Sequence, residues 1–277
     1  MNYTVPTISI VFMAISILAS VAIPAALYVF FRRKYGCAHI SFWVGCAVML
    51  VFAFILEQLV HSVILNSAAG AAIKANIWLY GAYGGLMAGL FEESGRLFAF
   101  STLLKKQRGN DHNALMYGAG HGGCEVVCLL TFTMINNLIY SIMLNNGQAA
   151  TLTAKLTDAQ AASMETAFAQ LSSTAPYMFL MGIVERGAAV IVQISLSVLV
   201  WFAVKEGGKK LWLYALAIVL HLVLDMASVV LNNYLPGAVI VTELIIWIVA
   251  IAYAFLARWV WKRNARPAPL MEANPSL

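Results

Sequence analysis

Long apolar stretches recur along the chain, and most polar residues are confined to the short segments between them. An α-helix needs about 20 apolar residues to cross a hydrocarbon layer about 30 Å thick, and each stretch reaches that length. The pattern therefore predicts an all-α fold, a polytopic membrane helical bundle of about seven transmembrane helices. The predicted spans cover residues 7–31, 41–65, 77–104, 113–141, 176–203, 211–233 and 238–261.

The segments between these spans are too short for a soluble domain. We therefore expect one transmembrane helical domain over residues 1–266 and a disordered tail over 267–277. The longest connection, residues 144–175, carries apolar residues at helical spacing, although Gln160 interrupts the stripe. This imperfect amphipathic pattern is compatible with a helix on the outer membrane surface. A plain connecting helix is favoured over a gating lid.

Charge adds an orientation to this bundle. Only 10% of the residues are charged, against about a quarter in soluble domains. Basic loops stay cytoplasmic, so we expect the N-terminus outside, the C-terminus inside, and a bacterial-type plasma membrane as the location. The basic residues that set this orientation account for most of the net charge of +5, so no nucleic-acid partner is expected. The basic residues on the predicted inner side are Arg32, Arg33, Lys34, Lys105, Lys106, Arg108, Lys205, Lys209, Lys210, Arg258, Lys262, Arg263 and Arg266.

Several ionisable residues lie inside the predicted spans, where a charged side chain costs about 2.5–3.5 kcal/mol and commonly marks function. A helix rises about 1.5 Å per residue, which puts Glu92, His121 and His221 about 20, 12 and 15 Å from the inner ends of their spans. The third, fourth and sixth spans would then bring acid and imidazole groups to one layer. The alternative is that such pairs only tie helices together.

The spacing within each span supports a shared site, because residues four apart lie on one helix face. Such pairs are Glu92–Arg96, His121–Glu125 and His221–Asp225, and Glu93 also shares a face with Arg96. Arg96 could hold one carboxylate ionised while the other serves as a general base. Two histidines could position water and stabilise an oxyanion. With Glu92 they could instead bind zinc, and both options, zinc or no cofactor, stay open.

A second set of charged residues lies nearer the outer boundary. We expect this set to form a structural network or to line an access path. It consists of Glu57 and His61 in the second span and Glu185 and Arg186 in the fifth. Because Glu185 and Arg186 are adjacent, we expect them to point apart and to have separate partners.

Three short motifs carry a family resemblance: Glu92-Glu93-Ser94-Gly95-Arg96, Tyr117-Gly-Ala-Gly-His121 and His221-Leu-Val-Leu-Asp225. In this order on these spans, the chain resembles the superfamily of CAAX proteases and bacteriocin-processing enzymes. It is most similar to the YhfC branch of intramembrane metalloproteases, over roughly residues 10–260.

The resemblance implies a peptidase that cleaves a membrane-embedded or membrane-associated protein or peptide. Glu92 or Glu93 would activate water with His121, while His221 and Asp225 would form the oxyanion side. Two positions depart from the family pattern: Tyr117 stands where many members have Phe, and Asp225 where prenyl-protein proteases have Asn. An ionised Asp225 is a poor oxyanion donor, so it must be protonated, orient His221 or assist a metal. Tyr117, Glu125, Glu185 and Arg186 are expected to support the site.

Two other functions fit the same residues. Some members of the superfamily resemble non-catalytic membrane scaffold or assembly subunits. Intramembrane Glu and His chains also build proton relays, so a proton-coupled transporter is possible, although the chain has no inverted repeat of the kind common in transporters.

Overall fold

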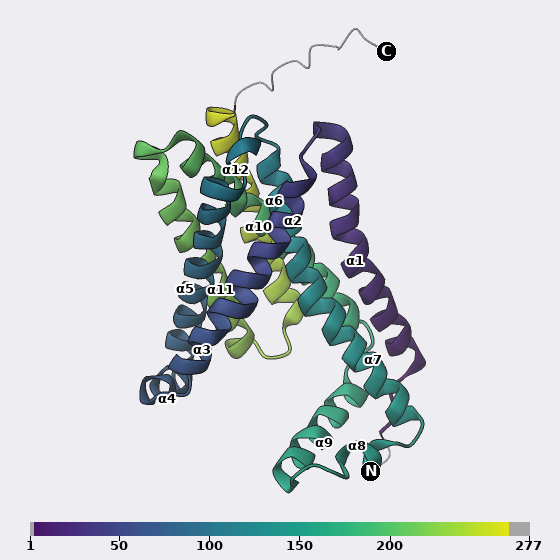
Figure 1. The fold of residues 1–277 in the computed structure, drawn as a ribbon. Helices are drawn as coiled ribbons and strands as arrows, with labels where there is room; N and C mark the ends of the chain where they lie inside the picture. Colours follow the sequence, from purple (N-terminus) through teal and green to yellow (C-terminus); the bar gives the residue numbers. More distant parts are fainter. Residues whose placement is uncertain (1–2, 266–277) are drawn as a thin grey trace. The chain divides into compact units, whose positions relative to one another are not determined.

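A computed structural model describes residues 3–265, so Arg266 and the predicted tail, 267–277, lie outside the described residues. Within that range every regular element is a helix, as predicted (Figure 1). The predicted spans correspond to α1 (Thr7–Tyr35), α2–η1–α3 (His39–Val48, Met49–Glu57, Gln58–Ile64), α5–η2 (Ile77–Phe98, Ala99–Leu103), α6–η4–α7 (Asn113–Val126, Val127–Thr131, Phe132–Asn145), α10 (Met178–Glu206), η5–α11 (Gly208–Leu211, Trp212–Tyr234) and α12 (Val239–Asn264). The connecting helices are α4 (Ala68–Ala75), η3 (Lys105–Gln107), α8 (Ala149–Thr153) and α9 (Asp158–Ser173).

Six of these helical segments, counted within the described residues, are long and apolar enough to cross a membrane. The chain is therefore an integral, multi-pass membrane protein. The remaining predicted span, α5–η2, is a continuous helical segment, but it carries Glu92, Glu93 and Arg96 and is rich in glycine. Seven spans and the orientation of the termini stay predictions.

The described chain divides into two compact units, and the single domain that we expect stays a prediction. Unit 1 comprises residues 1–25 and 125–187, and unit 2 comprises residues 26–124 and 188–277. Unit 1 has a core that includes Met13, Leu130, Met134 and Phe168. Polar contacts also join its segments, since Asn145 bonds both the N–H and the C=O of Val5, at 2.7 and 2.9 Å.

The loop helix predicted in residues 144–175 lies in unit 1 as two helices, α8 and α9. Gln160 does not interrupt α9, because it belongs to the capping box at its start: Thr157 accepts from the Gln160 N–H, and the Gln160 side chain accepts from the Thr157 N–H. Phe168 and Leu171 of the predicted stripe are buried.

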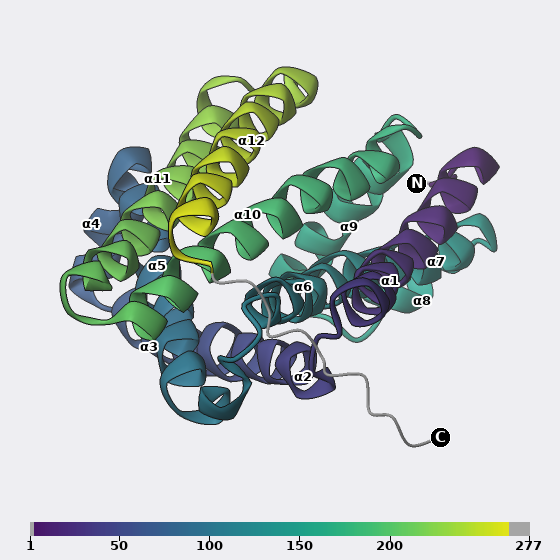
Figure 2. The same ribbon diagram turned by 90° about the horizontal axis from the view of Figure 1, so that it is seen from above.

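In unit 2, α5 and α11 lie side by side (Figures 1 and 2), and glycines permit their close approach. A Cβ added to Gly85 of α5 would lie 2.5 Å from the Leu222 carbonyl oxygen of α11. Likewise, a Cβ on Gly120 of α6 would lie 2.0 Å from the Phe42 carbonyl oxygen of α2. Small residues at such contacts let helices pack backbone against backbone. The glycine-rich third and fourth spans thus fix where α5, α6 and α11 place their polar side chains.

The basic segments of unit 2 meet at one end of it. Asn110 donates to the carbonyl of Tyr35 at 2.9 Å, and the ring of His112 stacks on Tyr35 with centroids 4.1 Å apart. Lys205 pairs with Asp111, and His112 also contacts Trp261. Segments that we predict to face the cytoplasm are therefore neighbours in space, while the side of the membrane on which they lie stays a prediction.

Candidate functional site

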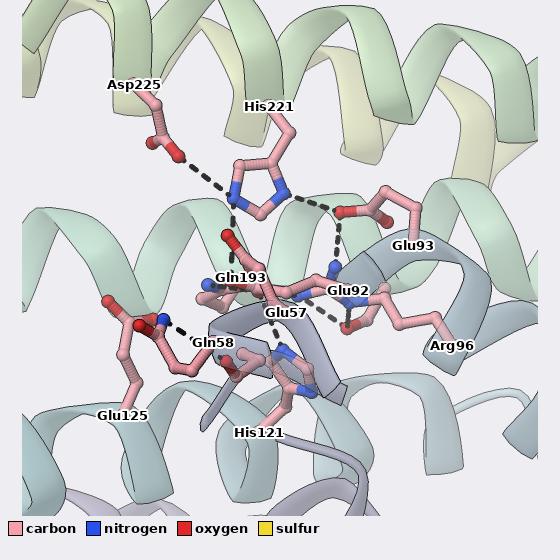
Figure 3. Close-up of polar contacts among 12 residues, drawn as sticks. Glu57, Gln58, Glu92, Glu93, Arg96, His121, Glu125, Gln193, His221 and Asp225 are labelled. Carbon is pink, nitrogen blue, oxygen red and sulfur yellow. Dashed lines mark hydrogen bonds and ion pairs between the residues drawn. The ribbon is translucent and has the colours of Figure 1, made fainter. Parts of the chain in front are cut away.

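Glu92 lies at the centre of a buried polar cluster in unit 2, between two histidines from two other helices (Figure 3). The Nε2 atom of His121, on α6, is 2.9 Å from Oε2 of Glu92. The Nε2 atom of His221, on α11, is 3.8 Å from Oε1 of the same carboxylate. All three residues are at most 6% exposed. The carboxylate and the two imidazoles from three helices therefore lie together in this cluster, which is the arrangement expected from the sequence.

Glu93 has a different role in the same cluster. It is fully buried, pairs with Arg96, and accepts from Nδ1 of His221 at 2.8 Å. Because Nδ1 is bound to Glu93, the Nε2 atom of His221 faces Glu92. Glu93 thus contacts one nitrogen of His221 and Asp225 lies near the other, and the role of Asp225 in orienting the ring stays a prediction.

Arg96 is the buried cation that both carboxylates share. Its guanidinium contacts Glu93 and lies 3.6 Å from Oε2 of Glu92. Its side chain is fully buried, so the ion pairs and hydrogen bonds must replace the lost hydration. Arg96 thus balances one of the two negative charges and holds α5 against α10.

Gln193 and Ser197 of α10 belong to the cluster, and the sequence analysis missed both. Gln193 donates to Oε2 of Glu92 at 3.1 Å and accepts from Arg96, while Ser197 accepts from Nε of Arg96 at 3.3 Å. A signal was present, since the two polar residues lie four apart on one face of α10, within a mainly apolar stretch. They were overlooked because neither side chain is ionisable.

Asp225 lies toward a more open side of the cluster, whereas Glu57 beside it is buried. Oδ2 of Asp225 is 3.6 Å from Nε2 of His221, and its side chain is 38% exposed. Glu57, at the end of the π-helical segment η1, is drawn beside the cluster in Figure 3 and bonds His61 Nε2 at 3.1 Å. Nδ1 of His61 in turn lies 2.8 Å from the hydroxyl of Tyr83. These contacts form a hydrogen-bonded row, Glu57–His61–Tyr83, that becomes more exposed away from Glu57.

Tyr117 supports His121 through its ring. The Tyr117 and His121 rings stack with centroids 5.7 Å apart, and Phe100 packs edge-on against the Tyr117 ring with centroids 4.6 Å apart. Tyr117 is fully buried. A phenylalanine, which many family members have at this position, could make the same ring contacts. Tyr117 can therefore stack on His121 as a phenylalanine would.

The remaining predicted residues form a separate cluster in unit 1. Arg186 pairs with Glu125 at 2.6 Å and also with Glu185. The expectation that Glu185 and Arg186 have separate partners was wrong, because the long arginine side chain reaches back to its neighbour. Glu125 therefore belongs with Arg186 in this second cluster.

A metal site was the alternative arrangement for Glu92, His121 and His221. Their donor types match the two histidines and one glutamate of catalytic zinc sites. However, His121 Nε2 is in direct hydrogen-bond contact with Glu92, and no group of three His, Cys, Asp or Glu side chains in residues 3–265 is arranged to hold a metal ion. The cluster as arranged is a hydrogen-bonded network.

Such a network suits acid–base chemistry on a water molecule. Glu92 offers a carboxylate held by His121, Gln193 and Arg96. A carboxylate beside imidazoles can take a proton from water and return it later. Donors already held in place can stabilise an oxygen that becomes negative.

Comparisons with known proteins agree with the motifs. The family model described as "YhfC intramembrane metalloprotease" matches residues 19–246. The chain is also 34% identical over 256 residues to a Bacillus subtilis (strain 168) protein named "Uncharacterized membrane protein YhfC", which covers 92% of this chain and 96% of the relative. No solved structure matches the chain.

Proposed function

This chain belongs to the YhfC intramembrane metalloprotease family, and we propose that it is an intramembrane peptidase. It hydrolyses a peptide bond in a membrane-embedded or membrane-associated substrate by means of a water molecule activated by Glu92 and His121. The observation that carries the proposal is the contact of Glu92 with histidines from two other helices, inside a buried cluster.

Within this proposal Glu92, rather than Glu93, is the general base. Both oxygens of Glu92 face a histidine, whereas Glu93 is fully buried and its Oε1 atom contacts both Arg96 and Nδ1 of His221. Glu92 takes a proton from water as the oxygen attacks the carbonyl carbon, and it then delivers that proton to the leaving amine as the C–N bond breaks.

The oxyanion side is assigned to His221. With Nδ1 bound to Glu93, a protonated Nε2 donates toward the oxygen that becomes negative in the tetrahedral intermediate. Asp225 lies on the Nε2 side of the ring and at the exposed edge of the cluster. Its carboxylate therefore stabilises the protonated ring, and it need not donate to the oxyanion itself.

The proposal is tested by comparing membrane-protein termini in cells that express the wild type, Glu92→Gln or His121→Ala. New termini should appear only with the wild type, and a peptide spanning such a site should be cleaved by purified, reconstituted protein. Loss of a general base should slow cleavage about 100-fold or more. Glu165→Gln, on α9 in unit 1, is the matched control and should cleave normally. Equal cleavage by the wild type and both cluster variants would reject these roles.

The same preparation tests the metal alternative. The hydrogen-bonded arrangement predicts cleavage that survives a chelator. Loss of cleavage with a chelator, restored by Zn²⁺ and accompanied by zinc in the wild type but not in His121→Ala, would assign the three side chains to a metal instead.

A further inference from the structure

A cavity of about 520 Å³ lies in unit 2, away from the Glu92 cluster, between α6, α10 and α12. Its inner walls are apolar and include Leu115, Ile191, Ile194 and Ala254. Ile191, Ile194 and Val198 lie on one face of α10 and cover about 10 Å along the helix axis. The walls thus form an apolar groove that runs parallel to the helices.

The mouth of this groove is basic and aromatic. Arg258 and Lys262, both exposed and one turn apart on α12, line it together with the stacked rings of Tyr35 and His112 and with Trp261. Burial lowers the pKa of His112 below its ordinary value, against the opposing effect of Asp111. The positive charge at the mouth at neutral pH therefore comes from Arg258 and Lys262.

These two cations differ from Lys205, the neighbouring base of α10. Lys205 pairs with Asp111, whereas no acidic side chain within residues 3–265 forms an ion pair with Arg258 or Lys262. Their charge is thus open to a ligand.

A second hollow, of about 490 Å³, lies on the other side of the same pair. Phe255 and Trp259 line it together with Arg258 and Lys262. The two cations therefore stand between two hollows with mainly apolar walls. A ligand with one anionic group between two hydrocarbon chains matches this arrangement of two cations between two hollows. A free anion would leave both hollows empty, and an amphiphile with a single chain would fill only one of them.

We propose that this site binds one anionic diacyl phospholipid, with its phosphate between Arg258 and Lys262 and one acyl chain in each hollow. The aromatic rings at the mouth suit the level of lipid headgroups. Basic pockets between helices on the predicted cytoplasmic side are favourable for anionic lipids, which are enriched in that leaflet. The bound lipid fills the groove between α6, α10 and α12 and so stabilises the helices that carry His121 and Gln193.

Native mass spectrometry of the purified, delipidated full chain tests this proposal without any peptidase assay. Dioleoyl phosphatidylglycerol should bind with a stoichiometry of one and about 25-fold more tightly than dioleoyl phosphatidylcholine, since each of the two basic residues contributes roughly a fivefold change. The double variant Arg258→Gln/Lys262→Gln should lose this preference. Lys209→Gln/Lys210→Gln removes two charges from η5, outside both hollows, and should keep it.

Further probes distinguish the possible ligands. Glycerophosphoglycerol, the headgroup without acyl chains, should not compete, and monoacyl phosphatidylglycerol should bind more weakly than the diacyl lipid. Ala254→Phe narrows the groove, leaves the cations in place, and should weaken phosphatidylglycerol binding.

Four results would overturn the proposal: equal affinity for the two diacyl lipids, equal loss in both double variants, full competition by the headgroup alone, or unchanged binding in Ala254→Phe. A photoreactive residue at position 194 identifies the occupant directly. A lipid adduct there supports the proposal, whereas cross-links to residues 266–277 or to a second copy of the chain overturn it.

Discussion

Each of the two units places one arginine between two glutamates, and the difference between these regions separates a candidate site from a structural tie. Arg96 is fully buried with Glu92 and Glu93, whereas Arg186 pairs with Glu125 and with Glu185, whose side chain is 46% exposed. In the first region the carboxylates also contact two histidines from other helices. An arginine between two carboxylates balances charge; the added imidazoles supply groups that can exchange protons.

The largest expected difference concerns the two arginines. Arg96→Met leaves two buried carboxylates without their cation and should destabilise the protein by about 3–5 kcal/mol. Arg186→Met should cost less, because Glu185 is 46% exposed and only Glu125 is then left as a buried carboxylate without its cation. Denaturant unfolding of both variants in the same detergent measures the two losses. Equal losses would contradict the distinction between the two regions.

A smaller effect is expected from neighbouring glycines of α5. The Cβ of Gly85→Ala would meet the Leu222 carbonyl, so α5 and α11 must separate, at a cost of about 1–3 kcal/mol. Because these helices carry Glu92 and His221, cleavage should fall together with thermal stability.

Gly84→Ala is the matched control for this variant. A Cβ at Gly84 meets nothing within 4 Å, and alanine favours a helix by about 1 kcal/mol over glycine. The control should therefore keep both stability and cleavage. Similar behaviour of the two variants would mean that the α5–α11 contact does not position the cluster.

The smallest effect is expected along the row Glu57–His61–Tyr83. His61→Ala removes a contact beside the cluster without touching Glu92, so cleavage should fall by less than about tenfold, well below the loss expected for a general base. His39→Ala, an exposed histidine that contacts Tyr28, is the control. Rates of purified protein measure both, and a loss in His61→Ala as large as in Glu92→Gln would move His61 into the reacting groups.

Much of the fold could be predicted because the bilayer imposes simple rules on the sequence. Span lengths follow from hydrocarbon thickness, and the predicted fifth span, 176–203, agrees closely with the observed Met178–Glu206. Predictions were less accurate for single residues whose position depends on one specific side-chain contact. Gln160 looked like an interruption of a stripe and instead caps α9. Arg186 was expected to avoid its neighbour, yet a long, flexible side chain can reach it.

By itself the sequence determined which helices carry the polar groups, because hydropathy and helical spacing act locally along the chain. Only the tertiary structure decided which groups touch. It separated the roles of Glu92 and Glu93, brought in Gln193, and assigned Glu125 to Arg186. Those outcomes depend on how α5, α6, α10 and α11 rotate and pack against one another, and that follows from close backbone contacts at glycines far apart in the sequence.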